Sequence, residues 1–312
     1  MQPATSWLAL CVSSVVACGE VHFVGLDADH PDAAVLVDAA VAADADVRCD
    51  LRAPFDPPAP LVGLSRSDML EIAPRLSIDE RSVYFHGRAT AETGSDLWVA
   101  DRVDRRSAFG QPRRLAISDA TAVDYEPALS ADGRTLVFAS SRVSGNVALF
   151  AATRDDVSDE FTSPMPLGGL DSASGFLDSS PSFSLDGREL WFASNRGHWS
   201  QWDLYRVRLT ATGPVDVQPA AVNSAGTEVA AAPSIDNAAL YFVANRPGVT
   251  AGNDVWVAYR AADGTLEEPH PVGGINSAGA EDGGWLSPDG CRYYFSSDRD
   301  GTHDLFVAER RR

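Results

Sequence analysis

Lysine is absent from the sequence, so all 25 basic residues are arginines. Acidic residues outnumber them at 44, and the formal net charge is −19. A chain of this charge lacks the basic face that binds nucleic acid through its phosphates, so we expect no nucleic-acid partner. The absence of lysine itself indicates a compositional bias of the genome rather than a site.

The motifs of several enzyme classes are missing as well. The sequence contains no nucleophile elbow, no glycine-rich phosphate loop and no Cys-x-x-Cys pair. Its six histidines show no close metal spacing. We therefore expect neither a transition-metal site nor a cofactor. The one alternative is a Ca²⁺ ion bound by a ring of carboxylates.

The sequence has no apolar run long enough to span a bilayer, although a short one opens the chain. Residues 7–18, "WLALCVSSVVAC", have the length of a signal-peptide core. The run ends in "VVAC", which resembles the bacterial lipobox, where cleavage precedes a cysteine that then carries lipid. We expect residues 1–17 to be a lipoprotein signal peptide and Cys18 to be lipidated. An ordinary secreted protein and a misread start codon are the alternatives, because no basic residue precedes Trp7.

A segment rich in Asp and Ala follows the lipobox. Its apolar residues show no sustained period, and acids dominate its charge. Such a composition cannot bury enough apolar surface to fold by itself, and it repels itself. We expect residues 18–48 to be a disordered acidic tether, and contact with the membrane to occur only through the lipid.

Five similar units fill the rest of the chain. They are "APRLSIDERSVYF" from Ala73, "EPALSADGRTLVF" from Glu126, "SPSFSLDGRELWF" from Ser180, "APSIDNAALYF" from Ala232 and "GGWLSPDGCRYYF" from Gly283. The position filled by Pro74, Pro127 and Pro181 is called the proline slot, and we assign Pro233 to it in the fourth unit, which then is two residues shorter. A period near 50 residues with short alternating strands is typical of a β-propeller, with one blade per period.

Each unit supplies the parts of one blade. An Asp-Gly turn between two alternating runs predicts a hairpin of a first and a second strand, because glycine tolerates positive φ. Glu80 and Asn237 replace this glycine in two units, and we expect local strain at Glu80. A third strand and a proline-rich outer strand follow, and proline suits a sheet edge.

The count of outer strands predicts how the ring closes. Five units have the first three strands, but only four outer strands follow a third strand. The missing one is "FDPPAPLVGL", residues 55–64, at the start of the repeat region. We therefore predict an all-β, five-bladed propeller over residues 49–312, closed by an N-terminal strand that completes the C-terminal blade.

The phrase "SPDG…YYFSSDRDG…HDLFVA" resembles the TolB-type, WD-like propeller repeat of bacterial envelope proteins, as do "NSAGAED" and "NSAGTE". The resemblance covers residues 55–310. It implies a propeller that serves as a binding or scaffolding module. TolB proteins carry an extra N-terminal domain, which this chain replaces with the acidic segment, so the resemblance does not carry their partner over.

An acid lies three residues before the proline slot in four blades: Glu71, Asp124, Asp178 and Glu281. Blade four has Ala230 there and Glu228 two positions earlier. These acids could form a ring at the channel mouth that binds Ca²⁺ or a cationic ligand, or that acts as the acid and nucleophile of a hydrolase. We favour a structural role, because a feature repeated in every blade is expected to hold every blade.

Arginines and aspartates near the loop between the second and third strands point the same way. Arg88, Arg142, Arg196, Arg246 and Arg299 end the second strands, and Asp96, Asp203, Asp254 and Asp304 open the third. We expect an Arg–Asp fork across this loop in each blade. Blade two has Ala148 in the aspartate position, so Arg142 is predicted to be free.

The residues that break the repeat are the candidates for a binding patch. The loop "GHWSQWD" of blade three contains His198, Trp199 and Trp202, and Trp285 follows the proline slot of blade five. Exposed aromatic residues on the loops of a rigid scaffold are common in recognition sites. Together with Arg142 they form the predicted patch, with packing between blades as the alternative for two of the tryptophans.

Cysteine usage predicts one disulfide. Export would remove Cys11 and lipid would occupy Cys18, which leaves Cys49 and Cys291 in an oxidising compartment. Cys291 begins the second strand of the last blade. The N-terminal outer strand of that blade begins at the same end, six residues after Cys49, and six residues can cross one intervening strand. We therefore predict a Cys49–Cys291 bond.

Taken together, these features favour a non-catalytic lipoprotein of the bacterial cell envelope whose propeller binds an envelope protein or a polysaccharide. The alternative is a propeller-fold glycoside hydrolase or lyase that uses channel carboxylates. The acidic positions of the four blades have similar surroundings, which argues against an enzyme, because a general acid and a nucleophile need different environments.

Overall fold

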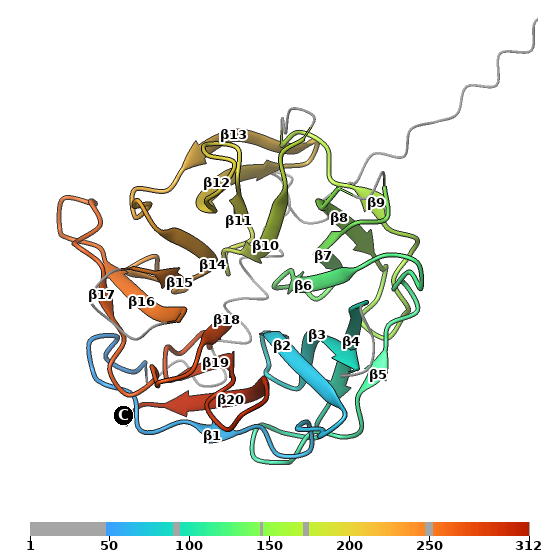
Figure 1. Ribbon diagram of the computed structural model, residues 1–312, viewed down its shortest axis with the longest axis horizontal. Coiled ribbons are helices and arrows are strands. Elements are labelled where there is room, and N and C mark those ends of the chain that lie inside the picture. Colours follow the sequence, from blue (N-terminus) through green and yellow to red (C-terminus); the bar gives the residue numbers. More distant parts are fainter. Residues whose placement is uncertain (1–47, 90–93, 144–145, 171–174, 247–251, 312) are drawn as a thin grey trace, which may run out of the picture.

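The computed structural model describes residues 48–89, 94–143, 146–170, 175–246 and 252–311. Within these ranges, five four-stranded antiparallel sheets stand around a central axis like the blades of a propeller (Figure 1). The predicted all-β, five-bladed architecture is confirmed. No helix among these residues is long and apolar enough to cross a membrane. The predicted signal peptide, Cys18 and the tether up to residue 47 lie outside the described residues.

Each blade is a meander whose first strand lies next to the axis. Blade one contains β2 (Met69–Leu76), β3 (Ser82–Ala89), β4 (Asp96–Asp101) and β5 (Arg113–Arg114). Blade two contains β6 (Asp124–Leu129), β7 (Thr135–Ser140), β8 (Ala148–Thr153) and β9 (Met165–Pro166). Blade three contains β10 (Asp178–Phe183), β11 (Glu189–Ser194), β12 (Asp203–Thr210) and β13 (Gly213–Pro219). Blade four contains β14 (Thr227–Pro233), β15 (Ala239–Asn245), β16 (Asp254–Tyr259) and β17 (His270–Pro271).

Blade five combines the two ends of the described chain. Its inner strands are β18 (Glu281–Leu286), β19 (Arg292–Ser297) and β20 (Asp304–Glu309), and its outer strand is β1 (Ala59–Pro60). Ala59 lies opposite Val307 in an antiparallel register, and the Leu61 amide donates to the Leu305 carbonyl at 2.8 Å. The last blade therefore takes its outermost strand from the segment that precedes the first blade.

The innermost strand of every blade contains a β-bulge beside the axis. The pairing with the second strand shifts at this point, for example between Ser179 and Ser182. The bulged residues have positive φ in all five blades: Ala73 (55°), Glu126 (54°), Ser180 (49°), Ala230 (53°) and Gly283 (60°). Because Ala230 is the bulged residue of blade four, Ala231 occupies its proline slot. The assignment of Pro233 to that slot, and the shortening of blade four, were wrong.

Blade five has Gly284 in the proline slot because Tyr293 needs the space. A Cβ atom at Gly284 would overlap the hydroxyl of Tyr293, which is fully buried. In the other blades a smaller residue, such as Leu190 of blade three, occupies the position of Tyr293. The glycine and the tyrosine are therefore adapted to each other.

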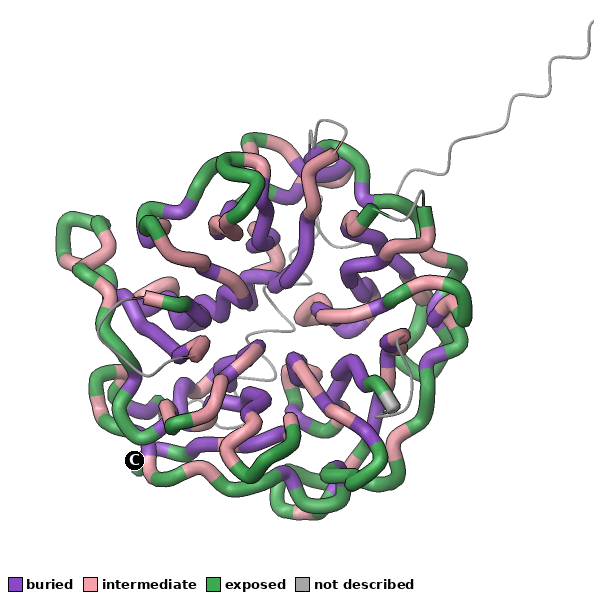
Figure 2. The backbone as a smooth tube through the Cα atoms, in the orientation of Figure 1, coloured by how far each residue is buried: buried purple, intermediate pink, exposed green. Residues whose placement is uncertain are grey.

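The hydrophobic core lies between the blades and follows the second and third strands. A phenylalanine in each second strand is fully buried: Phe85, Phe138, Phe192, Phe242 and Phe295. Aromatic rings of the third strands stack on several of them, with centroids 5.8 Å apart for Phe192 and Tyr205. Figure 2 shows that buried residues concentrate in the inner part of the ring and exposed residues along its outer edge. The scaffold beneath the loops is thus closely packed.

The predicted disulfide is confirmed. Cys49 and Cys291 are bonded, with their Cα atoms 5.1 Å apart. The Cys49 amide also donates to the Asp289 carbonyl at 3.0 Å, in the turn between β18 and β19. The bond ties the segment before β1 to the blade that β1 completes.

Candidate functional site

Four of the acids at the start of the innermost strands form ion pairs inside their blades. The pairs are Asp124–Arg142 (2.9 Å), Asp178–Arg196 (2.9 Å), Glu228–Arg246 (3.1 Å) and Glu281–Arg299 (3.0 Å). All four carboxylates are buried. Glu228 therefore occupies the acidic position of blade four. These side chains are fully engaged in holding the first and second strands of each blade together.

The arginines of these pairs also pack against aromatic rings. The Arg196 guanidinium lies 4.9 Å from the centroid of Phe192 and 5.1 Å from that of Tyr205. The prediction that each arginine pairs with the aspartate that opens the third strand was wrong, because Arg196 binds Asp178. The prediction that Arg142 is free was also wrong, because Asp124 accepts hydrogen bonds from its guanidinium at 2.9 and 3.0 Å.

Glu71 of blade one is the exception. It lies opposite Gly87 in the sheet, where blade three has Ser194, and Ala89 takes the place of the pairing arginine. Arg88 is one position too early and is exposed. Both carboxyl oxygens of Glu71 are buried without a hydrogen-bond partner among the described residues. Burial and the nearby Asp304 raise the pKa of Glu71, and the charge and backbone amide of Arg66 lower it by less. The resulting pKa is about 8, so this carboxyl is mostly protonated at neutral pH.

A different carboxylate, Glu126, lies at the propeller axis. It is the bulged residue of β6, and the amide and hydroxyl of Ser180 in blade three donate to it at 2.7 and 2.9 Å. Its own amide donates to Nδ1 of His86 in blade one at 3.1 Å. Burial raises the pKa of Glu126, the Ser180 hydrogen bonds and Arg75 lower it, and Asp282 of blade five raises it further. Interactions with blades one, three and five locate this residue of blade two near the centre of the ring.

Arg75 and Asp282 complete an axial cluster with Glu126. Arg75 is 4% exposed, and its guanidinium donates to the carbonyls of Pro74 and Gly284, whereas its Nε has no partner in the described ranges. Burial lowers the pKa of Arg75 to about 10. Asp282 accepts a hydrogen bond of 2.8 Å from the Asn253 side chain.

Sequence reasoning missed the axial cluster. Asp282 directly follows the blade-facing Glu281, and alternate residues of a strand face opposite sides. This alternation predicts that the side chain of Asp282 faces the propeller axis. Only blade two has an acidic residue, Glu126, directly before its proline slot. Features common to all blades therefore do not include it.

The predicted binding patch is only partly brought together. Trp199 is 69% exposed and stacks on Phe176, with ring centroids 4.8 Å apart and planes at 29°. His198 is exposed beside it, whereas Trp202 is half-buried. Trp285 is buried against Tyr294 in the core, and Arg142 belongs to its ion pair.

The stacked pair of Phe176 and Trp199 is called the aromatic shelf. Phe176 lies in the loop before β10 and Trp199 in the loop between β11 and β12. These two kinds of loop share one face of the propeller, called the upper face. The sequence held a signal for Phe176 that was missed, because blades two, four and five have the small residues Ala122, Gly226 and Gly279 at the same position.

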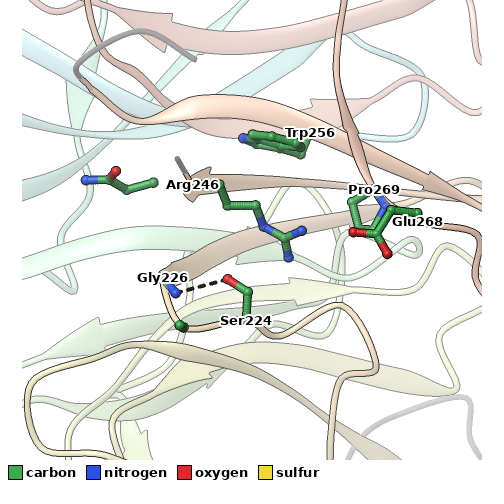
Figure 3. A pocket seen from close by; sticks show the side chains of 8 residues that line it. Ser224, Gly226, Arg246, Trp256, Glu268 and Pro269 are labelled. Carbon is green, nitrogen blue, oxygen red and sulfur yellow. Dashed lines mark hydrogen bonds between the residues drawn. The ribbon is translucent and has the colours of Figure 1, made fainter. Parts of the chain in front are cut away.

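A pocket of about 580 Å³ lies on the upper face at blade four. It is lined by residues from the loop before β14, the end of β15, β16 and the segment before β17, among them Ser224, Asn245, Arg246, Trp256, Glu268 and Pro269 (Figure 3). The guanidinium of Arg246 lies between Trp256 and Ser224 in this view, with Glu268 and Pro269 across the opening. In the described part of the chain, no group of three or more His, Cys, Asp or Glu residues is arranged to hold a metal ion.

The sequence matches no protein-family model, and no curated protein matches it. Solved structures with a similar fold include TolB from Acinetobacter baumannii, at 15% identity and a TM-score of 0.49. That match covers 77% of this chain and 54% of the TolB chain, so this chain spans about half of that protein. A family 117 glycoside hydrolase from Zobellia galactanivorans has 13% identity and a TM-score of 0.59, covering 83% and 90% of the two chains. The catalytic domain of a family 62 α-L-arabinofuranosidase from Coprinopsis cinerea has 12% identity and a TM-score of 0.54, covering 84% and 98%. At these identities the two likenesses with TM-scores above 0.5, those to the glycoside hydrolase and the arabinofuranosidase, show the fold alone.

Proposed function

We propose that this protein is a non-catalytic binding module of the bacterial cell envelope, whose propeller binds a protein or polysaccharide partner through its upper face. The observation that carries the proposal is the aromatic shelf. Trp199 keeps 69% of its surface exposed although it stacks on Phe176. A large, pre-ordered aromatic surface loses little entropy when a partner covers it, which favours binding.

The ion pairs of the blades support the non-catalytic reading. Asp124, Asp178 and Glu281 each bind an arginine and are buried, so these acids do not reach a ligand. A general acid and a nucleophile taken from these positions would both have to leave their pairs, and breaking a buried pair costs about 3 to 5 kcal/mol.

The proposed location is the envelope, with a lipid anchor at Cys18. The Cys49–Cys291 bond is compatible with an extracytoplasmic location, since such bonds persist in oxidising compartments. We further propose that β1 closes the ring, because it supplies the outer strand of blade five and the disulfide ties the preceding segment to that blade.

A pull-down from envelope extract with the full-length protein tests the proposal. We expect Trp199→Ala to lose the captured partner while its melting temperature is unchanged. Val103→Ala is the matched control, because Val103 is 76% exposed and follows the third strand, at the other end of its blade. Equal capture by the wild type and by Trp199→Ala would contradict the proposal.

A second candidate function is glycoside hydrolysis at the axial cluster. Burial keeps Glu126 prone to protonation, and Asp282 supplies a second carboxylate near it. Two carboxyl groups in different environments are the usual basis of glycosidic bond cleavage. Turnover of aryl-glycosides or polysaccharides that disappears in Glu126→Gln or Asp282→Asn, with folding intact, would place this candidate first.

A further inference from the structure

The pocket at blade four has an ordered base and two uncommitted polar side chains. A Cβ atom at Gly226 would overlap the Asn245 carbonyl, so the loop before β14 lies directly against the end of β15. Arg246 is held by Glu228 at 3.1 Å and by the Val222 carbonyl. The side chains of Asn245 and Glu268 have no hydrogen-bond partner within the described ranges. The pocket is therefore preformed, and its free groups are an amide and a carboxylate.

The lining of the pocket indicates the chemistry of its ligand. Pro269 supplies apolar surface, and so does the small accessible part of Trp256, which is 7% exposed and lies beneath the Arg246 guanidinium. Asn245 and Glu268 can bind hydroxyl groups. A sugar ring combines an apolar face with an edge of hydroxyls and matches this lining. The volume of about 580 Å³ lies in the range of small-molecule sites.

Charge argues for a neutral ligand. A polyanion would meet Glu268 and a chain of net charge −19. A cationic ligand would meet the guanidinium of Arg246 on the wall opposite Glu268 (Figure 3). A neutral ligand avoids both penalties and can still donate hydroxyl protons to Glu268.

One loop connects the pocket with the aromatic shelf. The Gln201 side-chain amide donates to the carbonyl of Ala225, which belongs to the pocket lining. Gln201 lies two residues after Trp199, so their Cα atoms are at most about 7 Å apart. The shelf and the pocket are thus neighbours on the upper face, within reach of one ligand of several linked rings.

We propose that the pocket and the aromatic shelf are two subsites for one neutral oligosaccharide, in which Asn245 and Glu268 bind the hydroxyls of one sugar ring and Trp199 stacks on another. This inference rests on the proposed binding function and selects a glycan as the partner.

Calorimetric titration of the full-length protein tests the inference. The probes are cellohexaose, xylohexaose, arabinohexaose and maltohexaose, the matching disaccharides, and polygalacturonate as the anionic counterpart. We expect at least one neutral hexaose to bind more tightly than its disaccharide, and polygalacturonate not to bind.

Three variants separate the two subsites. Glu268→Ala and Asn245→Ala should weaken both the hexaose and the disaccharide by about tenfold, equivalent to 1.4 kcal/mol. Trp199→Ala should weaken the hexaose by a similar factor and leave the disaccharide unchanged. Asp300→Ala is the matched control, since Asp300 is an exposed acid on the loop between β19 and β20 of the same face.

Two results would overturn the inference. The first is that none of the four neutral hexaoses binds at millimolar concentration, and the second is that Glu268→Ala binds as well as the wild type. If Trp199→Ala still abolishes capture of an envelope protein in either case, the proposed binding function stands and only the glycan assignment fails. If neither a glycan nor an envelope partner depends on Trp199, both fail.

Discussion

Arg292 of blade five donates two hydrogen bonds of 2.7 Å to the carboxylate of Glu80 in blade one. Glu80 stands at φ 60° in the turn position where three other blades have glycine, and it is 1% exposed. The Tyr294 hydroxyl donates to the same carboxylate at 2.7 Å. The unfavourable backbone conformation at Glu80 is therefore offset by a bond between the first and the last blade.

Glu80→Gln should destabilise the protein by about 2 to 4 kcal/mol, because among the described residues it leaves the half-buried Arg292 with Asp289 alone as its ionic partner. Glu80→Gly should recover at most about 1 kcal/mol of this loss through its relaxed backbone. Chemical denaturation measures both. Asn237→Gly, at the same turn position in blade four, is the control and should change stability little. Unaltered stability of Glu80→Gln would refute this role.

The buried Glu71 predicts a pH dependence of stability. Its pKa is raised from 4.5 to about 8 in the folded protein, so the folded state holds a proton that the unfolded state releases between these values. The free energy of unfolding should therefore fall as pH rises from 4.5 to 8. Glu71→Gln removes this term and should be more stable than the wild type by about 1 to 3 kcal/mol at pH 8.5, with little difference near pH 4.5.

Asp178→Asn is the matched control for Glu71. It removes the charge of the buried Asp178 that pairs with the half-buried Arg196, so we expect it to lower stability by about 3 kcal/mol at neutral pH. Thermal unfolding of both variants across this pH range distinguishes the two kinds of carboxyl. Equal destabilisation by the two amides would show that Glu71 has a cationic partner after all.

Removing the disulfide should weaken the whole domain. Cys49 and Cys291 are 242 positions apart, so the bond closes a long loop, and its loss should cost about 2 to 5 kcal/mol. Denaturation of the Cys49→Ser/Cys291→Ser double variant measures this. Reductant should lower the wild-type midpoint to that of the double variant and leave the variant unchanged; a wild type indifferent to reductant would contradict the prediction.

Lipidation at Cys18 is checked by labelling. A bacterial host that expresses the chain should incorporate a labelled fatty acid, and Cys18→Ala should abolish the label. Cys11→Ser, in the same apolar run, is the control and should keep it. Label that persists in Cys18→Ala would show that the lipobox is misidentified.

The features predicted from the sequence are the ones that depend on local turns. Asp-Gly pairs report hairpins, and counting hairpins predicted both the number of blades and the approach of Cys49 to Cys291. The sequence alignment of blade four was wrong because Ala231 occupies the proline slot, and Pro233, a proline two residues later, was assigned to it instead. A recurring residue type identifies equivalent positions only when the backbone conformation at those positions also recurs.

Pairing across strands was harder to predict, because it depends on register. Arg196 was expected to bind Asp203, its neighbour across a loop, but it binds Asp178 from the strand on the other side. Arg88 looked equivalent to Arg196 in the sequence, yet it lies one residue early, and Glu71 remains without a guanidinium. The bulges add to the difficulty, since four of the five place a non-glycine residue at positive φ.

The pairing of β1 with β20 also has a consequence for the order in which the domain can form. During synthesis Ala59 leaves the ribosome long before its partner Val307, so blade five is the last to be completed. Until then the edge of β1 is unpaired and Cys49 has no partner. These long-range contacts predict slow folding, because β1 and β20 must meet before the contacts of blade five can stabilise the domain. The chain is therefore most exposed to aggregation in the interval before residues 291–309 are available to complete blade five.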